Sequence, residues 1–87
     1  MNQYATQFSV YQNPVLNTLQ LVVQLPTKQK LTLQVRDMNG RVIIQQEQTG
    51  YTGRASLSVP VERLNKGTYL IQVKSESINT TKTFIKQ

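Results

Sequence analysis

The sequence of 87 residues contains no cysteine and no histidine, and only four acidic residues accompany its ten lysines and arginines. Without cysteine there is neither a disulfide nor a cysteine-based metal site, and the sequence does not indicate whether the protein resides in a reducing or an oxidising compartment. Without histidine or cysteine, zinc and copper sites are implausible. The serines Ser56 and Ser58 have no histidine to act as a base for nucleophilic attack. We therefore expect a protein that is not an enzyme and that holds no cofactor.

Long apolar runs are also missing from the chain. No stretch approaches the roughly 20 apolar residues of a membrane-spanning helix, so no insertion into a membrane is expected. No basic segment followed by an apolar core opens the chain, so no signal peptide is expected at its start. The leader of an exported parent protein would lie upstream of Met1. The length predicts one domain, with no room for a second core.

Acidic residues are too few to balance the basic ones, and the formal net charge is +6. Such a charge invites a nucleic-acid or anionic-surface interpretation. The basic residues are scattered, however, and only Lys28 and Lys30 stand close together. Solvated outer faces of strands explain them better, so no nucleic-acid partner is expected. A nucleic-acid binder would require an affinity that falls steeply with salt, and this alternative stays open to that test.

What the sequence does contain is alternation of apolar and polar residues with period 2, the pattern of strands with one buried face. In the stretch Gly67–Val73, for example, Tyr69, Ile71 and Val73 share one face. Comparable patterns predict strands over 8–11, 17–25, 30–37, 41–48, 55–59, 67–73 and 80–86, with no convincing helix. We therefore predict an all-β fold, an immunoglobulin-like antiparallel β-sandwich of about seven short strands. Residues 1–7 are polar and aperiodic, which predicts a linker or disordered segment before a domain over 8–87.

Two local motifs predict particular turns. Asn39-Gly40 lies between two alternating runs and predicts a type I′ hairpin turn, which needs positive φ at both central residues. The spacing Gly67-x-Tyr69 predicts a tyrosine corner, in which the Tyr69 hydroxyl bonds to the backbone a few residues upstream. Asp37-x-Asn39-Gly40 also has the opening of a calcium loop, but the further oxygen ligands of such a loop are missing. A role in shaping the turn is preferred, and no metal is expected.

The segment Thr49–Arg54 is punctuated by glycines and is predicted to be a loose loop. Its Tyr51 is expected to be exposed and is a candidate contact residue, whereas the other aromatic residues are better explained as core and edge residues. An immunoglobulin-like module that binds carbohydrate or a cell-surface protein would use this loop as its contact. That alternative function remains open from the residues alone.

Three motifs follow one another along the chain and end with a terminal strand: Val10-Tyr11-Gln12-Asn13-Pro14-Val15-Leu16-Asn17, Asp37-Met38-Asn39-Gly40-Arg41-Val42, Leu64-Asn65-Lys66-Gly67-Thr68-Tyr69-Leu70-Ile71-Gln72-Val73, and Thr83-Phe84-Ile85-Lys86. In this order and spacing the sequence closely resembles the type A C-terminal sorting domain of the type IX secretion system of Bacteroidetes, from about Phe8 onward. One departure is Gln12, where the family usually has the first proline of Tyr-Pro-Asn-Pro. Pro14 is retained.

The resemblance implies a secretion signal. Such domains end secreted cargo proteins, which reach the periplasm by an ordinary leader peptide. The folded domain is then read by the outer-membrane translocon and its shuttle protein, and a surface sortase removes it, usually attaching the cargo to anionic lipopolysaccharide. The implied location is the periplasm in transit to the outer-membrane surface or the extracellular space. The sequence leaves open whether an isolated domain dimerises through an edge strand.

The resemblance also points to candidate residues. The family-motif positions are Pro14, Asp37, Asn39, Gly40, Arg41, Gly67 and Tyr69. Of these, Gly40, Gly67 and Tyr69 are most simply required for the fold. The last strand would have unpaired backbone on one side if it lay at a sheet edge, and a partner could add a strand there. The predicted recognition element is Lys82, Thr83, Phe84, Ile85 and Lys86, with Lys82 and Lys86 steering towards an acidic surface.

Overall fold

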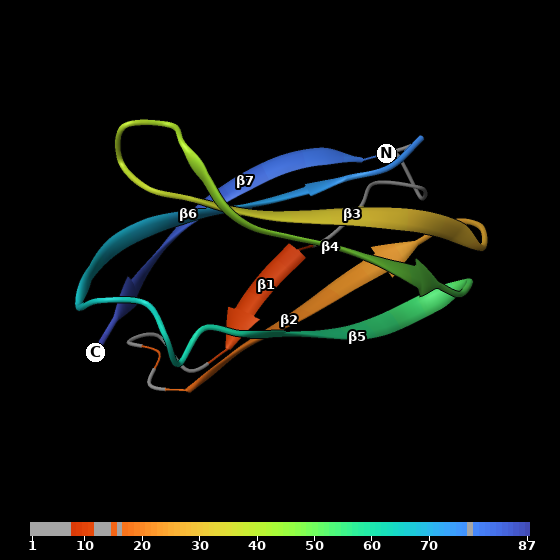
Figure 1. The fold of residues 1–87 in the computed structure, drawn as a ribbon. Helices are drawn as coiled ribbons and strands as arrows, with labels where there is room; N and C mark the ends of the chain where they lie inside the picture. Colours follow the sequence, from red (N-terminus) through yellow and green to blue (C-terminus); the bar gives the residue numbers. More distant parts are fainter. Residues whose placement is uncertain (1–7, 12–14, 16, 77) are drawn as a thin grey trace.

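The computed structural model of the chain describes residues 8–11, 15, 17–76 and 78–87. Its strands are β1 (Phe8–Tyr11), β2 (Thr18–Leu25), β3 (Gln29–Arg36), β4 (Val42–Gly50), β5 (Gly53–Pro60), β6 (Gly67–Lys74) and β7 (Asn79–Lys86). They form two antiparallel sheets with the strand orders β1-β2-β5 and β4-β3-β6-β7 (Figure 1). The prediction of an all-β fold is confirmed. The predicted linker over residues 1–7 and the motif residues Gln12 and Pro14 lie outside the described residues.

The two sheets share one hydrophobic core, built from the inward-facing residues of each strand. In β2 and β3 every second side chain is buried, as the alternation predicts, and β6 contributes Ile71 and Val73. The largest of the fully buried side chains is Phe84 of β7. Full burial of a large apolar side chain contributes roughly 1.5–3 kcal/mol. Within the described part of the chain, no helix is long and apolar enough to cross a membrane.

The connection between β4 and β5 is shorter than predicted. The expected loop over residues 49–54 is reduced to Tyr51 and Thr52, because β4 continues to Gly50 and β5 begins at Gly53. The two strands belong to different sheets, so the chain passes from one sheet to the other here. A Cβ at buried Gly50 would overlap the Leu25 Cδ1 atom and lie 3.0 Å from the Leu31 Cδ1 atom. Glycine is therefore needed at this position because the backbone approaches the core closely. The sequence pattern predicted a loop here instead.

The turn of the β3–β4 hairpin also differs from the prediction. Gly40 N donates to Asp37 O at 3.0 Å, and Asp37 N donates to Arg41 O at 3.0 Å. The centre of the turn is therefore Met38-Asn39, followed by Gly40 with φ of +87°. This is a three-residue hairpin loop with a left-handed glycine, and the prediction of a two-residue type I′ turn was wrong.

The start of β4 is irregular. Val35 pairs with Ile44, whereas Arg36 pairs with Val42, so the register shifts and leaves Ile43 as an extra residue on β4. Such a bulge breaks the strict alternation of faces. As a result, the consecutive residues Val42 and Ile43 are both exposed.

Candidate functional site

The terminal strand β7 lies at an edge of the four-stranded sheet. It pairs with β6 along its whole length, from Lys74↔Asn79 to Gly67↔Lys86. On the other side of β7, the described residues form a bridge only at its C-terminal end, where Val15 pairs with Lys86 in parallel. Val15 N donates to Ile85 O, and Gln87 N donates to Val15 O, both at 2.7 Å. The edge is thus covered at its end by Val15, a residue distant from β7 in the chain.

The bonds to Val15 also show which backbone groups of β7 face outward. The N–H and C=O of a strand residue point to the same side, and that side alternates from one residue to the next. Because Ile85 O and Gln87 N face Val15, the odd-numbered residues of β7 direct their backbone away from β6. Thr81 and Thr83 therefore present their N–H and C=O groups at the outer edge.

The side chains of the predicted recognition element separate into two groups. Phe84 is fully buried, and Lys86 is only 6% exposed, with its Nζ donating to Gln87 O at 2.7 Å. Neither side chain is presented to a partner, so Lys86 does not provide the exposed steering charge that was expected. Lys82, Thr83 and Ile85 are exposed. They are the side chains of this set that a partner can reach directly.

The tyrosine corner is present at the start of β6. Tyr69 Oη donates to Asn65 O at 2.8 Å, four residues upstream, as the spacing predicts. The Tyr69 ring packs on Phe84 of β7, with centroids 5.8 Å apart and planes inclined by 26°. Gly67, which opens the strand, has φ of +154°. The corner thus joins the turn before β6 to the core contact between β6 and β7.

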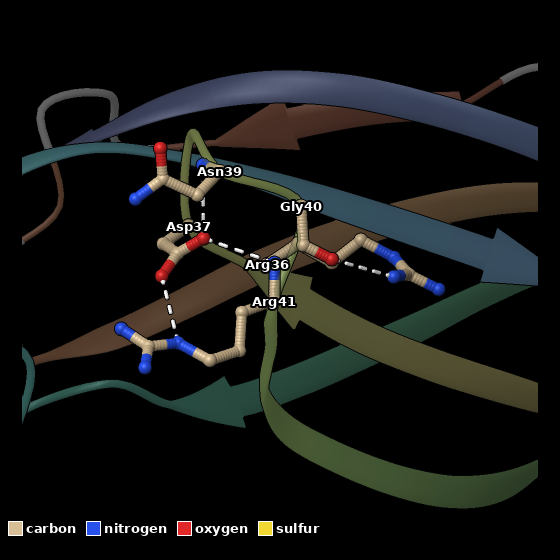
Figure 2. A network of polar contacts seen from close by, with 5 residues as sticks. All are labelled: Arg36, Asp37, Asn39, Gly40 and Arg41. Carbon is tan, nitrogen blue, oxygen red and sulfur yellow. Dashed lines mark hydrogen bonds and ion pairs between the residues drawn. The ribbon is translucent and has the colours of Figure 1, made fainter.

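The Asp37 carboxylate organises the β3–β4 hairpin (Figure 2). Its Oδ1 atom accepts from Asn39 N at 2.9 Å and from Arg41 N at 3.0 Å. Its Oδ2 atom accepts from Arg41 Nε at 3.2 Å. On the other side of the loop, Arg36 Nη1 donates to Gly40 O at 2.9 Å. The motif residues Asp37, Asn39, Gly40 and Arg41 are therefore brought together in one network.

These contacts change the titration of Asp37. The N–H of Arg41, donating to the carboxylate, is the main cause that lowers the pKa of Asp37 below its usual value of 3.8. Partial burial opposes this effect, while the N–H of Asn39 and the guanidinium of Arg41 add to it. Both carboxylate oxygens accept hydrogen bonds from the hairpin itself. The group therefore acts as an acceptor that shapes the turn.

Tyr51, the candidate loop contact, lies between β4 and β5 and is 63% exposed. The Nζ atom of Lys28, in the turn between β2 and β3, lies 5.2 Å from the centroid of its ring. A cation over an aromatic face at this distance is attracted by the ring quadrupole, weakly at exposed sites. The pair lies outside the β3–β4 hairpin and β7, and so does not belong to either of those groups of motif residues.

Residues 9–87 match the protein family described as the secretion system C-terminal sorting domain. The chain belongs to this family. No curated protein matches the chain. Among solved structures, a selenomethionine-labelled β-glucosidase from Kluyveromyces marxianus is similar with a TM-score of 0.53 and 10% sequence identity, over 100% of this chain and 15% of that chain. At such an identity the similarity concerns the fold alone, and this chain matches only a small part of the enzyme.

Family membership confirms the recognition made from the motifs. The sorting domain is a secretion signal of cargo proteins and carries no catalytic activity of its own. It marks its cargo for the type IX secretion system, so the machinery of that system recognises the domain and the cargo crosses the outer membrane.

The sorting domain also contains a polar network that the sequence did not reveal. Arg36 Nη2 donates to Gln34 Oε1 at 2.7 Å, and Gln34 Nε2 donates to Gln45 Oε1 at 2.9 Å. In the opposite direction, Arg36 Nε donates to Gln72 Oε1 at 3.4 Å, and Gln72 Nε2 donates to Asn79 Oδ1 at 2.9 Å. The chain of bonds crosses β4, β3, β6 and β7. Alternation marks Gln34, Arg36 and Gln72 as outward-facing, but the contacts of the network depend on strand order and register.

A groove of about 560 Å³ lies between β4 and the β5–β6 connection. It is lined by Ile43, Ile44, Gln46, Pro60, Val61, Glu62, Arg63 and Leu64. Exposed Val42 and Met38 lie just before its β4 wall in the chain. Sequence reasoning assigned the apolar start of β4 to an ordinary return strand, because a bulge leaves no signal in an apolar run.

Proposed function

We propose that the secretion machinery reads the sorting domain at the outer edge of β7, by adding a strand to it. The observation that carries this proposal is the position of β7 at the end of the four-stranded sheet. The outward backbone of Thr81 and Thr83 offers hydrogen-bonding groups to an incoming strand, which is how an extended partner gains affinity at a sheet edge. The exposed side chains of Lys82 and Ile85 supply specificity there, while Thr83 contributes through its backbone. Lys82 is the positive charge that steers an acidic partner.

The partners in this proposal are the outer-membrane translocon, its shuttle protein and the sortase that removes the domain. Family membership supports them, because it places the chain among the signals of this secretion system. We propose that the domain occupies residues 8–87 and follows a linker or disordered segment over residues 1–7. Its location is the periplasm in transit, and then the outer-membrane surface or the extracellular space. Tyr51 remains a proposed loop contact, since its ring is exposed.

We also propose that the fold is an immunoglobulin-like sandwich. In such folds a sheet of the order G-F-C-C′ packs on a sheet that contains strands A, B and E. The orders β7-β6-β3-β4 and β1-β2-β5 correspond to these two sheets strand by strand. Tyr69 near the start of β6 occupies the place of the tyrosine corner on strand F. These correspondences support the assignment of β7 to the edge strand G.

The test is secretion of a reporter protein fused to this domain in a bacterium that has the type IX system. Thr83→Pro removes an outward N–H of β7 and leaves the bonds to β6 in place, because proline is tolerated where its nitrogen faces away from the sheet. We expect the fusion to accumulate in the periplasm although circular dichroism shows a folded domain. The matched control Thr83→Ala keeps the N–H and is expected to be secreted.

Two results would count against strand addition at β7. One is normal secretion of a folded Thr83→Pro fusion. The other is equal loss of secretion in Thr83→Pro and Thr83→Ala, which would assign recognition to the threonine side chain instead. If Thr83→Pro does not fold, Thr81→Pro with Thr81→Ala repeats the comparison two residues further from the buried Phe84.

A further inference from the structure

The Asn39-Gly40 pair has a chemical property that the secretion role does not use. In an asparagine–glycine sequence the glycine nitrogen can attack the asparagine Cγ atom, since glycine has no side chain to hinder it. A bond forms between Gly40 N and Asn39 Cγ, the Cγ–Nδ2 bond breaks, and Nδ2 leaves as ammonia with the proton from Gly40 N. Water then opens the cyclic succinimide to aspartate or isoaspartate. Both residues are exposed, so burial gives them no protection.

The register of the turn decides whether this attack is available. In the two-residue turn predicted from the sequence, the hydrogen bond of the turn would be donated by Arg41 N, and Gly40 N would have no acceptor within the turn. In the structure the turn begins one residue earlier, and Gly40 N donates to Asp37 O at 3.0 Å. The attacking nitrogen is thus directed at a carbonyl oxygen. Attack requires this bond to break and the backbone to rotate.

Two further hydrogen bonds hold the same two residues in place. Asn39 N donates to Asp37 Oδ1 at 2.9 Å, and Gly40 O accepts from Arg36 Nη1 at 2.9 Å. The fixed φ of +87° at Gly40 completes the restraint. Because charge-assisted hydrogen bonds are stronger than neutral ones, Asp37 and Arg36 make opening of the loop costly.

We propose that Asn39 is a conformation-gated deamidation site, which the Asp37–Arg41 hairpin keeps unreactive in the folded domain and which reacts when the hairpin opens. The isoaspartate product would not restore the hairpin. Isoaspartate inserts a methylene into the backbone before Gly40, and either product adds a carboxylate beside that of Asp37. Isoaspartate formed in an unfolded chain would therefore leave a domain that cannot rebuild the motif.

Mass spectrometry of the peptide that spans the hairpin measures this reaction. The folded chain and the same chain in urea are incubated at mildly alkaline pH, and the conversion of Asn39 is followed with time. We expect the folded chain to react at least about tenfold more slowly, the ratio that corresponds to roughly 1.4 kcal/mol of restraint. Asn79, which threonine follows, is the internal control and is expected to react slowly in both samples.

Two variants test which hydrogen bonds restrain Asn39 and Gly40. Asp37→Ala removes the carboxylate acceptor, and Arg36→Gln removes the bond to Gly40 O while leaving Asp37 in place. In each folded variant we expect faster hydrogen exchange at Gly40 N and faster deamidation of Asn39, about tenfold or more for the loss of a hydrogen bond to a charged group. Equal rates in the folded and urea-treated chains would overturn the proposal. So would faster exchange at Gly40 N without faster deamidation, in whichever of the two variants folds.

Discussion

At the scale of single residues, the Asp37 carboxylate connects the sequence motif to a measurable property. It accepts from two backbone N–H groups and one guanidinium, and these donors favour its charged form. The pKa of Asp37 is therefore lower in the folded state than its usual value of 3.8. A carboxyl group with a depressed folded pKa stabilises the fold when the pH lies above its unfolded pKa.

The sign of the pH effect follows from this shift. Stabilisation by Asp37 is fully present above the unfolded pKa and is lost as the pH falls through the lower folded pKa. We expect Asp37→Asn to reduce the stability of the domain at neutral pH, and to reduce it less as the pH falls through that range. Urea unfolding of both proteins across a pH series measures the difference. A difference that does not change with pH would show that the charge of Asp37 is irrelevant to stability.

The tyrosine corner allows a second prediction for one atom. Tyr69→Phe deletes the hydroxyl that donates to Asn65 O and keeps the ring that packs on Phe84. Since a typical hydrogen bond contributes about 0.5–1.5 kcal/mol net, we expect a loss of about 1 kcal/mol in the free energy of unfolding. Tyr51→Phe is the matched control at an exposed position and should change stability little. Equal losses in the two variants would mean that the hydrogen bond from Tyr69 to Asn65 contributes no more to the free energy of unfolding than an exposed tyrosine hydroxyl does.

At the scale of elements, alternation predicted where each strand lies but not how the strands are joined. The predicted ranges for the strands that became β3, β6 and β7 differ from the observed ones by at most one residue at each end. The turn at Asn39-Gly40 was misplaced because the choice of its first residue depends on the Asp37 carboxylate, which a pattern of faces does not include. Gly50 was assigned to a loop because its close approach to Leu25 exists only in three dimensions.

The same limit applies to the candidate site. Strand addition at the last strand was predicted on the condition that this strand lies at a sheet edge, and β7 does lie there. The alternation of period 2, however, did not predict that Phe84 and Lys86 face inward. Phe84 and Ile85 are both apolar, so the strand has no clearly polar side. The bridge from Val15 joins residues far apart in the chain and has no local signal.

The edge strands of this domain differ in how far their outward backbone groups are covered. The outward carbonyl of Ser58 on β5 accepts from Gln46 Nε2 at 2.9 Å and from Gln48 Nε2 at 3.0 Å. On β7 the C-terminal end is covered by Val15. Natural proteins protect edges in such ways because exposed edges recruit other strands. Among the described residues, nothing bridges the outer side of β7 at Thr81 and Thr83. That contrast agrees with the proposed use of this stretch by a partner.

At the scale of the whole molecule, recognition and stability meet in β7. Phe84 is the largest fully buried side chain, and its neighbour Ile85 is 47% exposed. Replacing a buried phenylalanine by alanine costs about 3–5 kcal/mol, whereas a domain is stable by only about 5–15 kcal/mol. Loss of secretion after deletion of the last residues would therefore not identify a recognition element, because the deletion also removes Phe84.

A pair of neighbouring variants separates the two roles. We expect Phe84→Ala to lose most of its resistance to urea and to fail in secretion because the domain is unfolded. Ile85→Ala removes an exposed side chain, so its unfolding should change by less than about 1 kcal/mol. If β7 is read at its outer edge, the folded Ile85→Ala fusion should nevertheless be secreted less efficiently than the unchanged domain. Full secretion of the Ile85→Ala fusion would restrict recognition to the backbone of β7. Full secretion of an unfolded Phe84→Ala fusion would show that the system does not read a folded domain at all.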